Sequence, residues 1–428
     1  MSHTLLLLIL LFAMVAINVP IAIALGASAV LVGFMMQGDF GFVGTILFSS
    51  LQKIELLAIP FFILAGHVFD RTGIMFRMFR FMDSLIGRVR GSTGLVASGV
   101  SVMLGGLSGS GPADTAALGS TLGPVMTKRG YSAPFTAALI SAGGSLGLVV
   151  PPSVAFILYG IVVPGISIGK MFIAGILPGL LMGLLIAMTS YVISVRRGYD
   201  AVNDAFSLSV CIKAFWASVW GLLAPLTIVG GIYFGVFTPT EAAGVAVVYG
   251  LLVGLLLHRE IGFRDLLPLL RVTAVDTSVV MLIVACASLF SWVLTVDGTI
   301  VVIVAGLARD LTAEWQVFLL AGFVLLIAGL FIDGASIYLV LVPMLMPAVR
   351  AFQIDLTWFG VFVAVAVAIG QFTPPVGVNL FVAARILDIK FERIIPDVLP
   401  FIGVSMLGLV LIYLFPAVSL WLPSTMPN

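Results

Sequence analysis

Long stretches without a charged side chain run through the sequence, among them residues 131–169, 171–195, 214–240 and 398–428. A helix of about 20 apolar residues is long enough to cross the hydrocarbon core of a bilayer. Only 9% of the residues are charged, whereas soluble domains carry about 25%. We therefore expect an integral membrane protein. The low charge and the net charge of +1 exclude a secreted, nucleic-acid-binding or disordered chain.

Short clusters of lysine and arginine separate the apolar runs. They predict sidedness, because cytoplasmic loops are enriched in these residues. Placing the clusters in the cytoplasm puts both termini in the periplasm. A basic amphipathic stretch, 76–90, is then expected to lie along the inner interface. Spans are predicted near residues 3–17, 20–37, 54–70, 133–163, 171–195, 214–236, 240–257, 272–296, 357–384 and 396–421.

The same pattern occurs twice in the chain. At an offset of 223 residues the aligned pairs are Gly106 and Gly329, Gly111 and Gly334, Gly147 and Gly370, and Pro151-Pro152 and Pro374-Pro375. The last two are the only Pro-Pro pairs in the sequence. Each half holds an odd number of crossings by this assignment, so the second half should be inverted. Inverted repeats with interrupted helices are a transporter architecture.

We therefore predict an all-α polytopic membrane protein made of two inverted repeats, each with a re-entrant helical hairpin and a broken helix. The expected division has five parts. They are a scaffold with an interfacial arm helix (1–91), a transport half (92–195), a cytoplasmic linker (196–213), a second scaffold with an arm helix at 300–316 (214–316), and a second transport half (317–428).

Residues 92–127 are too few for two full spans. The legs on either side of the expected tip have about 12 residues, or about 18 Å of helix, against a hydrocarbon core of about 30 Å. A re-entrant hairpin fits better. Its tip at 108–112 is expected to be non-helical, so its backbone must face protein or water. The matching tip of the second half is at 331–336.

Each Pro-Pro pair is expected to interrupt a helix, because proline lacks a backbone donor and disrupts the preceding turn. The freed carbonyl groups can bind a hard cation such as sodium, and the N-terminus of the next half-helix favours a carboxylate. Nearby side-chain oxygens belong to Ser108, Ser110, Ser145, Thr373 and Asn379. Glycine and serine also mediate close helix packing in membranes. The paired, repeated arrangement favours a binding site over packing alone.

Two aspartates accompany the tips: Asp114 follows the first and Asp333 lies in the second. Charges inside spans are costly and are functional candidates, so each could bind an ion or the substrate. The alternative is that each caps the second helix of its hairpin, because aspartate is a preferred N-cap residue.

Other charged residues are expected to be structural. Glu241 follows Thr238-Pro-Thr and is expected at the start of a helix. We favour structural roles for His67 and Asp276, and an interfacial anchor at Asp70-Arg71.

Five segments resemble the large membrane subunit of tripartite ATP-independent periplasmic (TRAP) transporters. They are LSGSGPADTAALGS (107–120), GLVVPPS (147–153), TPTEAAG (238–244), FIDGASIYLVLVPMLMP (331–347) and TPPVGVNLFVAAR (373–385). The resemblance implies sodium-coupled uptake of an organic acid, such as a C4-dicarboxylate or sialic acid, across the bacterial inner membrane by an elevator mechanism. It also implies two partners: a small four-helix membrane subunit and a periplasmic substrate-binding protein.

The resemblance further implies where the ligands bind. One sodium site would use Ser108, Ser110, Gly143, Ser145, Gly147 and Pro151. The other would use Asp333, Gly334, Ser336, Gly370, Thr373 and Pro375. The carboxylate substrate would lie near Ser110, Asp114, Ser153 and Asn379. The second tip has Asp333 where the first has Ser110, which argues against equal use of the two sites.

Other functions remain open at this point. A stand-alone sodium/dicarboxylate symporter of a related inverted-repeat family would need no binding protein. A passive channel would show no steep sodium dependence. An enzyme is not expected, because no lysine lies in mid-span and two cysteines with three histidines give no metal set. No GxxxxGK[ST] motif is present, so ATP is not the expected energy source.

Overall fold

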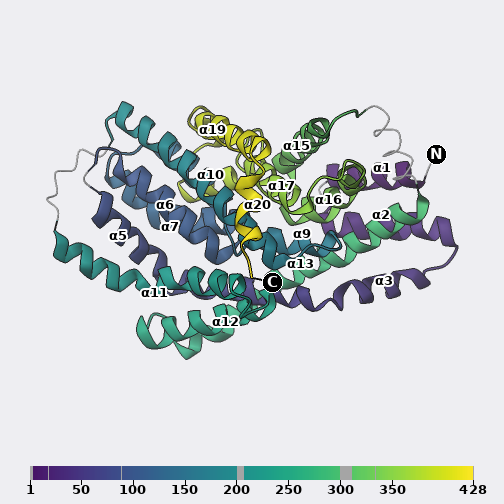
Figure 1. Cartoon of the computed structure of the whole chain (residues 1–428), viewed down its shortest axis with the longest axis horizontal. Helices are drawn as coiled ribbons and strands as arrows, with labels where there is room; N and C mark the ends of the chain where they lie inside the picture. Colours follow the sequence, from purple (N-terminus) through teal and green to yellow (C-terminus); the bar gives the residue numbers. More distant parts are fainter. Residues whose placement is uncertain are drawn as a thin grey trace.

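A computed structural model describes residues 3–17, 19–87, 89–199, 207–298, 311–332 and 334–427, and within these residues all regular structure is helical (Figure 1). The first half contains α1 (His3–Ala16), α2 (Ile21–Gln37), α3 (Gly41–Leu51), η1 (Ile54–Leu57), α4 (Ala58–Arg71), α5 (Ile74–Ile86), α6 (Ser92–Ser108), α7 (Gly111–Lys128), α8 (Ala133–Ser145), η2 (Leu146–Leu148), α9 (Val154–Val162) and α10 (Ile168–Arg197).

The second half contains α11 (Leu208–Tyr233), α12 (Pro239–Leu252), η3 (Val253–Leu257), α13 (Phe263–Asp297), α15 (Glu314–Phe331), α16 (Gly334–Ala351), α17 (Leu356–Gly370), α18 (Val378–Ile386), η4 (Phe391–Arg393), α19 (Ile395–Leu414) and α20 (Ala417–Ser424). In the described part of the chain, seven helices are long and apolar enough to cross a membrane. The number rises to eight if α3 and the following η1–α4 segment, bent by 62°, form one span. The chain is thus a multi-pass membrane protein.

Most predicted spans coincide with helices, and three details differ. Helix α3 was not predicted. The region 396–421 is two helices, because α19 ends at Leu414 and α20 begins after Pro416, which lacks the donor needed to continue a helix. Helix α13 begins at Phe263, earlier than expected. The arm helix predicted at 300–316 falls mostly outside the described residues.

Side-chain caps fix several helix starts. At α12, Thr238 N donates to Glu241 Oε2 (2.8 Å) and Glu241 N donates to Thr238 Oγ1 (3.3 Å). This capping box confirms the structural role expected for Glu241. At α17, Asp355 Oδ1 accepts hydrogen bonds from two backbone amides, at 2.8 and 2.9 Å. These caps satisfy amides that a helix start otherwise leaves without partners.

The two repeats are visible in the element order. The hairpin α6–α7 corresponds to α15–α16, and the interrupted helix α8–η2–α9 corresponds to α17–α18. Both Pro-Pro bonds at the interruptions are cis. Hairpin α6–α7 lies toward the end of the molecule that carries α5, and α15–α16 lies toward the end that carries the N-terminus (Figure 1). The predicted fold class, two inverted repeats in an all-α membrane protein, is confirmed.

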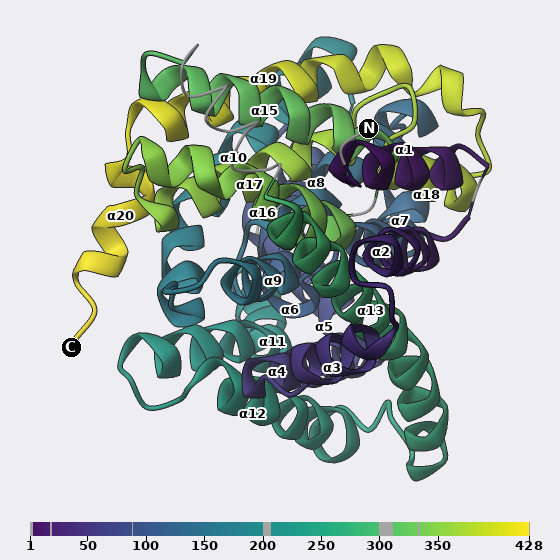
Figure 2. The same ribbon diagram turned by 90° about the vertical axis from the view of Figure 1, so that its right-hand side faces the viewer.

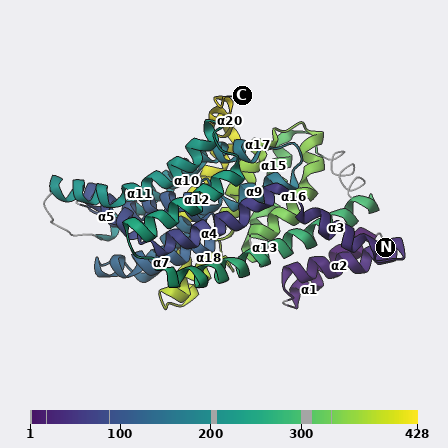
Figure 3. The same cartoon turned by 90° about the horizontal axis from the view of Figure 1, so that it is seen from below.

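The interrupted helices lie at the centre of the molecule. Seen along the long axis, α8, α9, α16 and α17 are central, and α3, α12, α19 and α20 are peripheral (Figure 2). Helix α18 of the second half packs against α7 and α8 of the first. The view from below separates α5 and α11 at one end from α1–α3 at the other (Figure 3). Helices α4 and α13 contact each other and reach hairpin helices α6 and α16, respectively.

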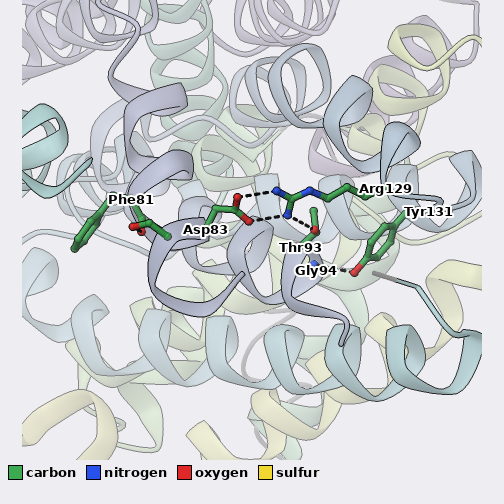
Figure 4. Close-up of polar contacts among 7 residues, drawn as sticks. Phe81, Asp83, Thr93, Gly94, Arg129 and Tyr131 are labelled. Carbon is green, nitrogen blue, oxygen red and sulfur yellow. Dashed lines mark hydrogen bonds and ion pairs between the residues drawn. The ribbon is translucent and has the colours of Figure 1, made fainter. Parts of the chain in front are cut away.

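An ion pair ties helix α5 to the base of the first hairpin (Figure 4). Both carboxylate oxygens of Asp83 accept hydrogen bonds from the guanidinium of Arg129, at 2.6 and 2.7 Å. Arg129 Nη1 also donates to Thr93 Oγ1 (2.8 Å), and Gly94 N donates to the hydroxyl of Tyr131 (3.2 Å). These contacts hold the C-terminal end of α7 beside the N-terminal end of α6.

Candidate functional site

The first hairpin turns over two residues. Helix α6 ends at Ser108, Gly109 has φ +66°, Ser110 is extended, and α7 begins at Gly111. The turn is shorter than the predicted non-helical tip at 108–112, because Pro112 fits the first turn of α7 without losing a hydrogen bond. A side chain at Gly109 is excluded by its positive φ and by Val154 N, 2.9 Å from the position of an added Cβ.

The first helix interruption lies directly beneath this turn. Helix α8 continues into η2, and the chain then runs through cis Pro151-Pro152 to Ser153. Ser153 is the N-cap of α9: its hydroxyl accepts a hydrogen bond from Ala155 N (3.2 Å) and donates to Leu148 O (2.9 Å). The second half-helix is therefore held at a fixed angle to the first.

The tip and the interruption of the first half are in direct contact. An added Cβ at Gly147 would collide with Asp114 Oδ2 and would lie 3.3 Å from Ser110 N. An added Cβ at Gly106 would lie 2.8 Å from Pro151 O. The structure thus brings Ser110 and Asp114 close to Gly147, and Gly106 close to Pro151.

The other three predicted residues of the first site have the following positions. Gly143 faces Ser101 of α6 rather than the tip. The hydroxyl of Ser145 donates to Ala142 O (2.7 Å) within its own helix. Ser108 is the last residue of α6, and its side chain lies outside the described part of the structure.

The second half repeats this contact. Helix α15 ends at Phe331 and α16 begins at Gly334, whereas Asp333 lies outside the described residues. Gly329 and Gly370 touch: an added Cβ at Gly329 would lie 2.8 Å from Gly370 Cα. Gly377 N donates to Leu330 O (3.0 Å), which joins the second interruption to the hairpin.

Two further predicted residues of the second site are Thr373, which follows the end of α17, and Ser336, in α16. The hydroxyl of Thr373 donates to Ile369 O (2.6 Å), and Ser336 is buried two residues after the start of α16. The carbonyl groups freed by the cis Pro374-Pro375 interruption are the main candidate ligands here.

The two halves also contact each other through Gln371, which was not among the predicted site residues. An added Cβ at Gly111 of the first tip would collide with Gln371 Oε1. An added Cβ at Gly334 of the second tip would lie 3.0 Å from Gln371 Nε2. The glutamine side chain therefore lies between the two tips. It is 2% exposed, and its Oε1 has no hydrogen-bond partner among the described residues.

Asn379 supports the same junction from α18. Its side-chain amide donates to Ser141 O (3.3 Å) of α8, and its backbone N donates to Gln371 O (3.0 Å). Its Oδ1 has no partner in the described part of the chain and lies near Gly111, 3.4 Å from the position of an added Cβ. Unpaired buried amide oxygens are costly unless something binds them.

A cavity of about 260 Å³ opens between the two tips and the scaffold. On one side it is lined by both tips, Gly109–Ala113 and Gly334–Ala335, and by Gln371. On the other side it is lined by His67 and Asp70 of α4 and Asp276 of α13. Ser110 and Gly334 are the predicted ligands that face this cavity. Asp114, Ser153 and Asn379 are buried beside it, at most 1% exposed.

His67 and Asp276 lie on the other side of the cavity. They are ionisable side chains within apolar helices, which makes them functional candidates as well as structural ones. The structure places them in the cavity wall as a pair, with His67 Nε2 and Asp276 Oδ2 2.8 Å apart. No comparable signal marks Gln371, which is an uncharged residue beside a proline pair.

The arrangement suits an anion and a hard cation. Helices α7 and α16 both begin at the cavity, and helix N-termini favour negative charge. Carbonyl and amide oxygens, which are ligands for hard cations, surround the interruptions. Among the described residues there is no group of three or more His, Cys, Asp or Glu side chains that could hold a metal ion.

Comparison with known proteins gives a family for this fold and site. Residues 8–418 match the model of the family described as tripartite ATP-independent periplasmic transporter, DctM component. The chain is 32% identical to the C4-dicarboxylate TRAP transporter large permease protein DctM of Rhodobacter capsulatus, over 97% of each chain. It is 36% identical to the sialic acid TRAP transporter large permease protein SiaM of Vibrio cholerae, over 88% of this chain and 87% of the relative.

Two further similarities concern length and fold. The chain is 36% identical to the isethionate TRAP transporter permease protein DctMQ of Oleidesulfovibrio alaskensis, over 95% of this chain, and it spans 64% of that relative's length. A crystal structure of the Alcanivorax borkumensis YdaH transporter superposes with a TM-score of 0.62 at 16% identity, covering 97% of this chain and 98% of the other. The latter similarity concerns the fold alone.

Proposed function

The chain belongs to the family of DctM components of tripartite ATP-independent periplasmic (TRAP) transporters, and from this premise we propose that it takes up an organic acid together with sodium. Its relatives are transporter permeases, which confirms that the chain is a transporter rather than an enzyme. Relatives are named for C4-dicarboxylates, sialic acid and isethionate, all of which are organic acids. We expect this chain to act in the bacterial inner membrane.

One observation carries the proposal: two helix N-termini from opposite halves meet at a single cavity beside two helix interruptions. The N-termini of α7 and α16 attract the carboxylate. The carbonyl groups at the interruptions, with Ser110 and the unpaired oxygens of Gln371 and Asn379 close by, attract sodium. Sodium would offset the repulsion between the acid and the buried carboxylate of Asp114, so the acid binds well only when sodium is present.

The position of the cavity between two parts of the molecule suggests how the acid is carried across the membrane. The two sides of the cavity belong to different parts of the molecule, the tips on one side and helices α4 and α13 on the other. We propose that the hairpins and broken helices move as a unit against this scaffold, as in an elevator. The membrane potential then contributes about 2.3 kcal/mol per net positive charge per 100 mV.

Two partners complete the proposed system. The word tripartite in the family description supports a complex of three components. We propose a small four-helix membrane subunit beside the scaffold and a periplasmic protein that delivers the acid. A stand-alone sodium/dicarboxylate symporter is the alternative, and it would transport without the delivering protein.

The test is uptake into proteoliposomes that contain the chain with its small subunit and binding protein. Labelled succinate, gluconate and 4-hydroxybutanoate serve as probes, under an inward sodium or an inward potassium gradient. We expect uptake of at least one acid to require sodium. Equal uptake under both gradients would refute sodium coupling, and uptake without the binding protein would favour the stand-alone symporter.

A matched pair of variants tests the site. Ser110→Ala removes a hydroxyl that faces the cavity, whereas Ser120→Ala removes a hydroxyl that donates to Ala117 O (3.1 Å) on an exposed part of α7. A hydrogen bond to a charged group contributes about 1.5–3 kcal/mol, and about 1.4 kcal/mol is tenfold. Ser110→Ala should therefore lower sodium-driven uptake at least about tenfold, and Ser120→Ala should leave it unchanged. Normal uptake by Ser110→Ala would contradict the site assignment.

A further inference from the structure

The scaffold side of the cavity is acidic. Three ionisable side chains line it: His67 and Asp70, one turn apart on α4, and Asp276 on α13. His67 Nε2 and Asp276 Oδ2 lie 2.8 Å apart, and these two side chains are 25% and 48% exposed. Asp70 is also exposed. Two carboxylates therefore face the cavity against one imidazole.

No described side chain of the cavity lining balances these carboxylates with a permanent positive charge, because the lining contains neither lysine nor arginine. The neighbouring Arg71 is outside the lining and points to Asp265, with a nitrogen–oxygen distance of 3.9 Å. A second anionic group placed at this wall would meet like charge, which costs several kcal/mol at a binding surface.

The opposite side of the same cavity favours negative charge. Helices α7 and α16 begin there, and helix N-termini favour an anion. Gln371 lies between the two tips with its side chain 2% exposed, and its Oε1 has no partner among the described residues. This buried, unsatisfied oxygen is an independent sign that the cavity holds a ligand with polar groups.

We propose that the transported acid carries a single anionic group, which binds at the tips, and hydrogen-bond donors at its far end, which bind Asp70 and Asp276. The donors are hydroxyl or ammonium groups, and a second carboxylate is selected against. His67 keeps Asp276 turned toward the cavity. The substrate class is thus a hydroxylated or zwitterionic monoacid rather than a dicarboxylate. This inference rests on the proposed function of the same cavity.

The experiment measures ligand binding to the purified chain in sodium chloride and in potassium chloride, from the shift in its melting temperature. The probes are two matched pairs: 4-hydroxybutanoate against succinate, and gluconate against glucarate. Within each pair the acids differ only at the far carbon, which is a hydroxymethyl group or a carboxylate. We expect the monoacid of at least one pair to bind at least about tenfold more tightly than its diacid, because only the diacid meets like charge.

A variant without the two carboxylates then tests whether the scaffold side of the cavity selects against a diacid. In Asp70→Asn combined with Asp276→Asn, both groups keep a hydrogen-bonding oxygen but lose their charge, so the preference for the monoacid should fall about tenfold. Asp39→Asn is the matched control. Asp39 lies in the α2–α3 loop outside the cavity, where its Oδ1 accepts a hydrogen bond from Gly41 N (2.8 Å), and asparagine can accept the same bond. This variant should keep the wild-type preference.

The outcomes separate this inference from the proposed function. Sodium-dependent binding in which the diacid is equal or preferred would overturn the inference and leave sodium-coupled acid binding intact. A monoacid preference that survives neutralisation of both aspartates would also overturn it. If no probe binds in a sodium-dependent way, both ideas are refuted together.

Discussion

The contact between Gly329 and Gly370 makes a sharp prediction about the second half. Hairpin helix α15 crosses α17 here so closely that an added Cβ at Gly329 would lie 2.8 Å from Gly370 Cα and 3.3 Å from two other atoms of the α17 backbone. The crossing places the second tip over the second interruption. Gly329→Ala should force the two helices apart, because a backbone atom, unlike the end of a side chain, cannot rotate away.

The magnitude follows from the distances. Carbon atoms in contact are normally about 3.5–4.0 Å apart, so the helices must separate by about 0.7–1.2 Å. Overpacking of this kind costs about 1–3 kcal/mol, and alanine returns about 0.5–1 kcal/mol through its better helix propensity. The net loss of stability is about 0–2.5 kcal/mol, or about 1–3 kcal/mol relative to a glycine-to-alanine change without the clash, and the melting temperature of the purified protein should fall by about 2 °C per kcal/mol.

Gly403→Ala provides the matched control, because Gly403 lies within α19 and has no atom within 4 Å of an added Cβ. This variant should be unchanged or slightly stabilised. Gly370→Ala should force the same two helices apart, since its Cβ would lie 2.7 Å from Gly329 Cα. The double variant should therefore lose less stability than the sum of the two single losses. A Gly329→Ala protein as stable as Gly403→Ala would refute the close crossing.

Variants at three further positions test the supports around the site, each by its melting temperature. Asp83→Asn should lose about 1–3 kcal/mol, because the half-buried guanidinium of Arg129 loses its ionic partner; no change would mean that water replaces the pair. Asp355→Ala should cost about 1 kcal/mol by removing the N-cap of α17, and Asp355→Asn should restore most of it. Ser153→Ala should cost about 1–2 kcal/mol, because a buried hydroxyl caps α9; unchanged stability would contradict that role.

Much of the architecture could be predicted because its signals are local. Proline has no backbone donor wherever it lies, so Pro151-Pro152 and Pro374-Pro375 located both helix interruptions. Charge-free length located most spans, and the short legs of residues 92–127 located the first hairpin. That the first tip lies against the first interruption was implied by the family resemblance, and the structure places Ser110 and Asp114 close to Gly147.

The features that were missed depend on packing between distant segments. Helix α3 has eleven residues and is too short to be recognised as a span. His67 and Asp276 lie 209 residues apart and become a pair only because α4 packs against α13. The breadth of the first tip was overestimated, since glycine and proline in sequence do not reveal that α7 begins at Gly111. Roles for Ser108 and Asp333 as sodium ligands stay predictions.

The repeat relation explains why one cavity can hold a polar ligand asymmetrically. At the offset of 223 residues, Gln371 corresponds to Leu148, and both line the cavity. The first tip meets Gln371 at Gly111, and the second tip meets Leu148 at the equivalent Gly334, where an added Cβ would lie 3.7 Å from Leu148 Cδ1. Each tip is thus contacted by a side chain of the other half, once by an amide and once by an apolar group. Because the backbone is paired while these side chains differ, the two halves can share one geometry and still present different chemistry to the cavity.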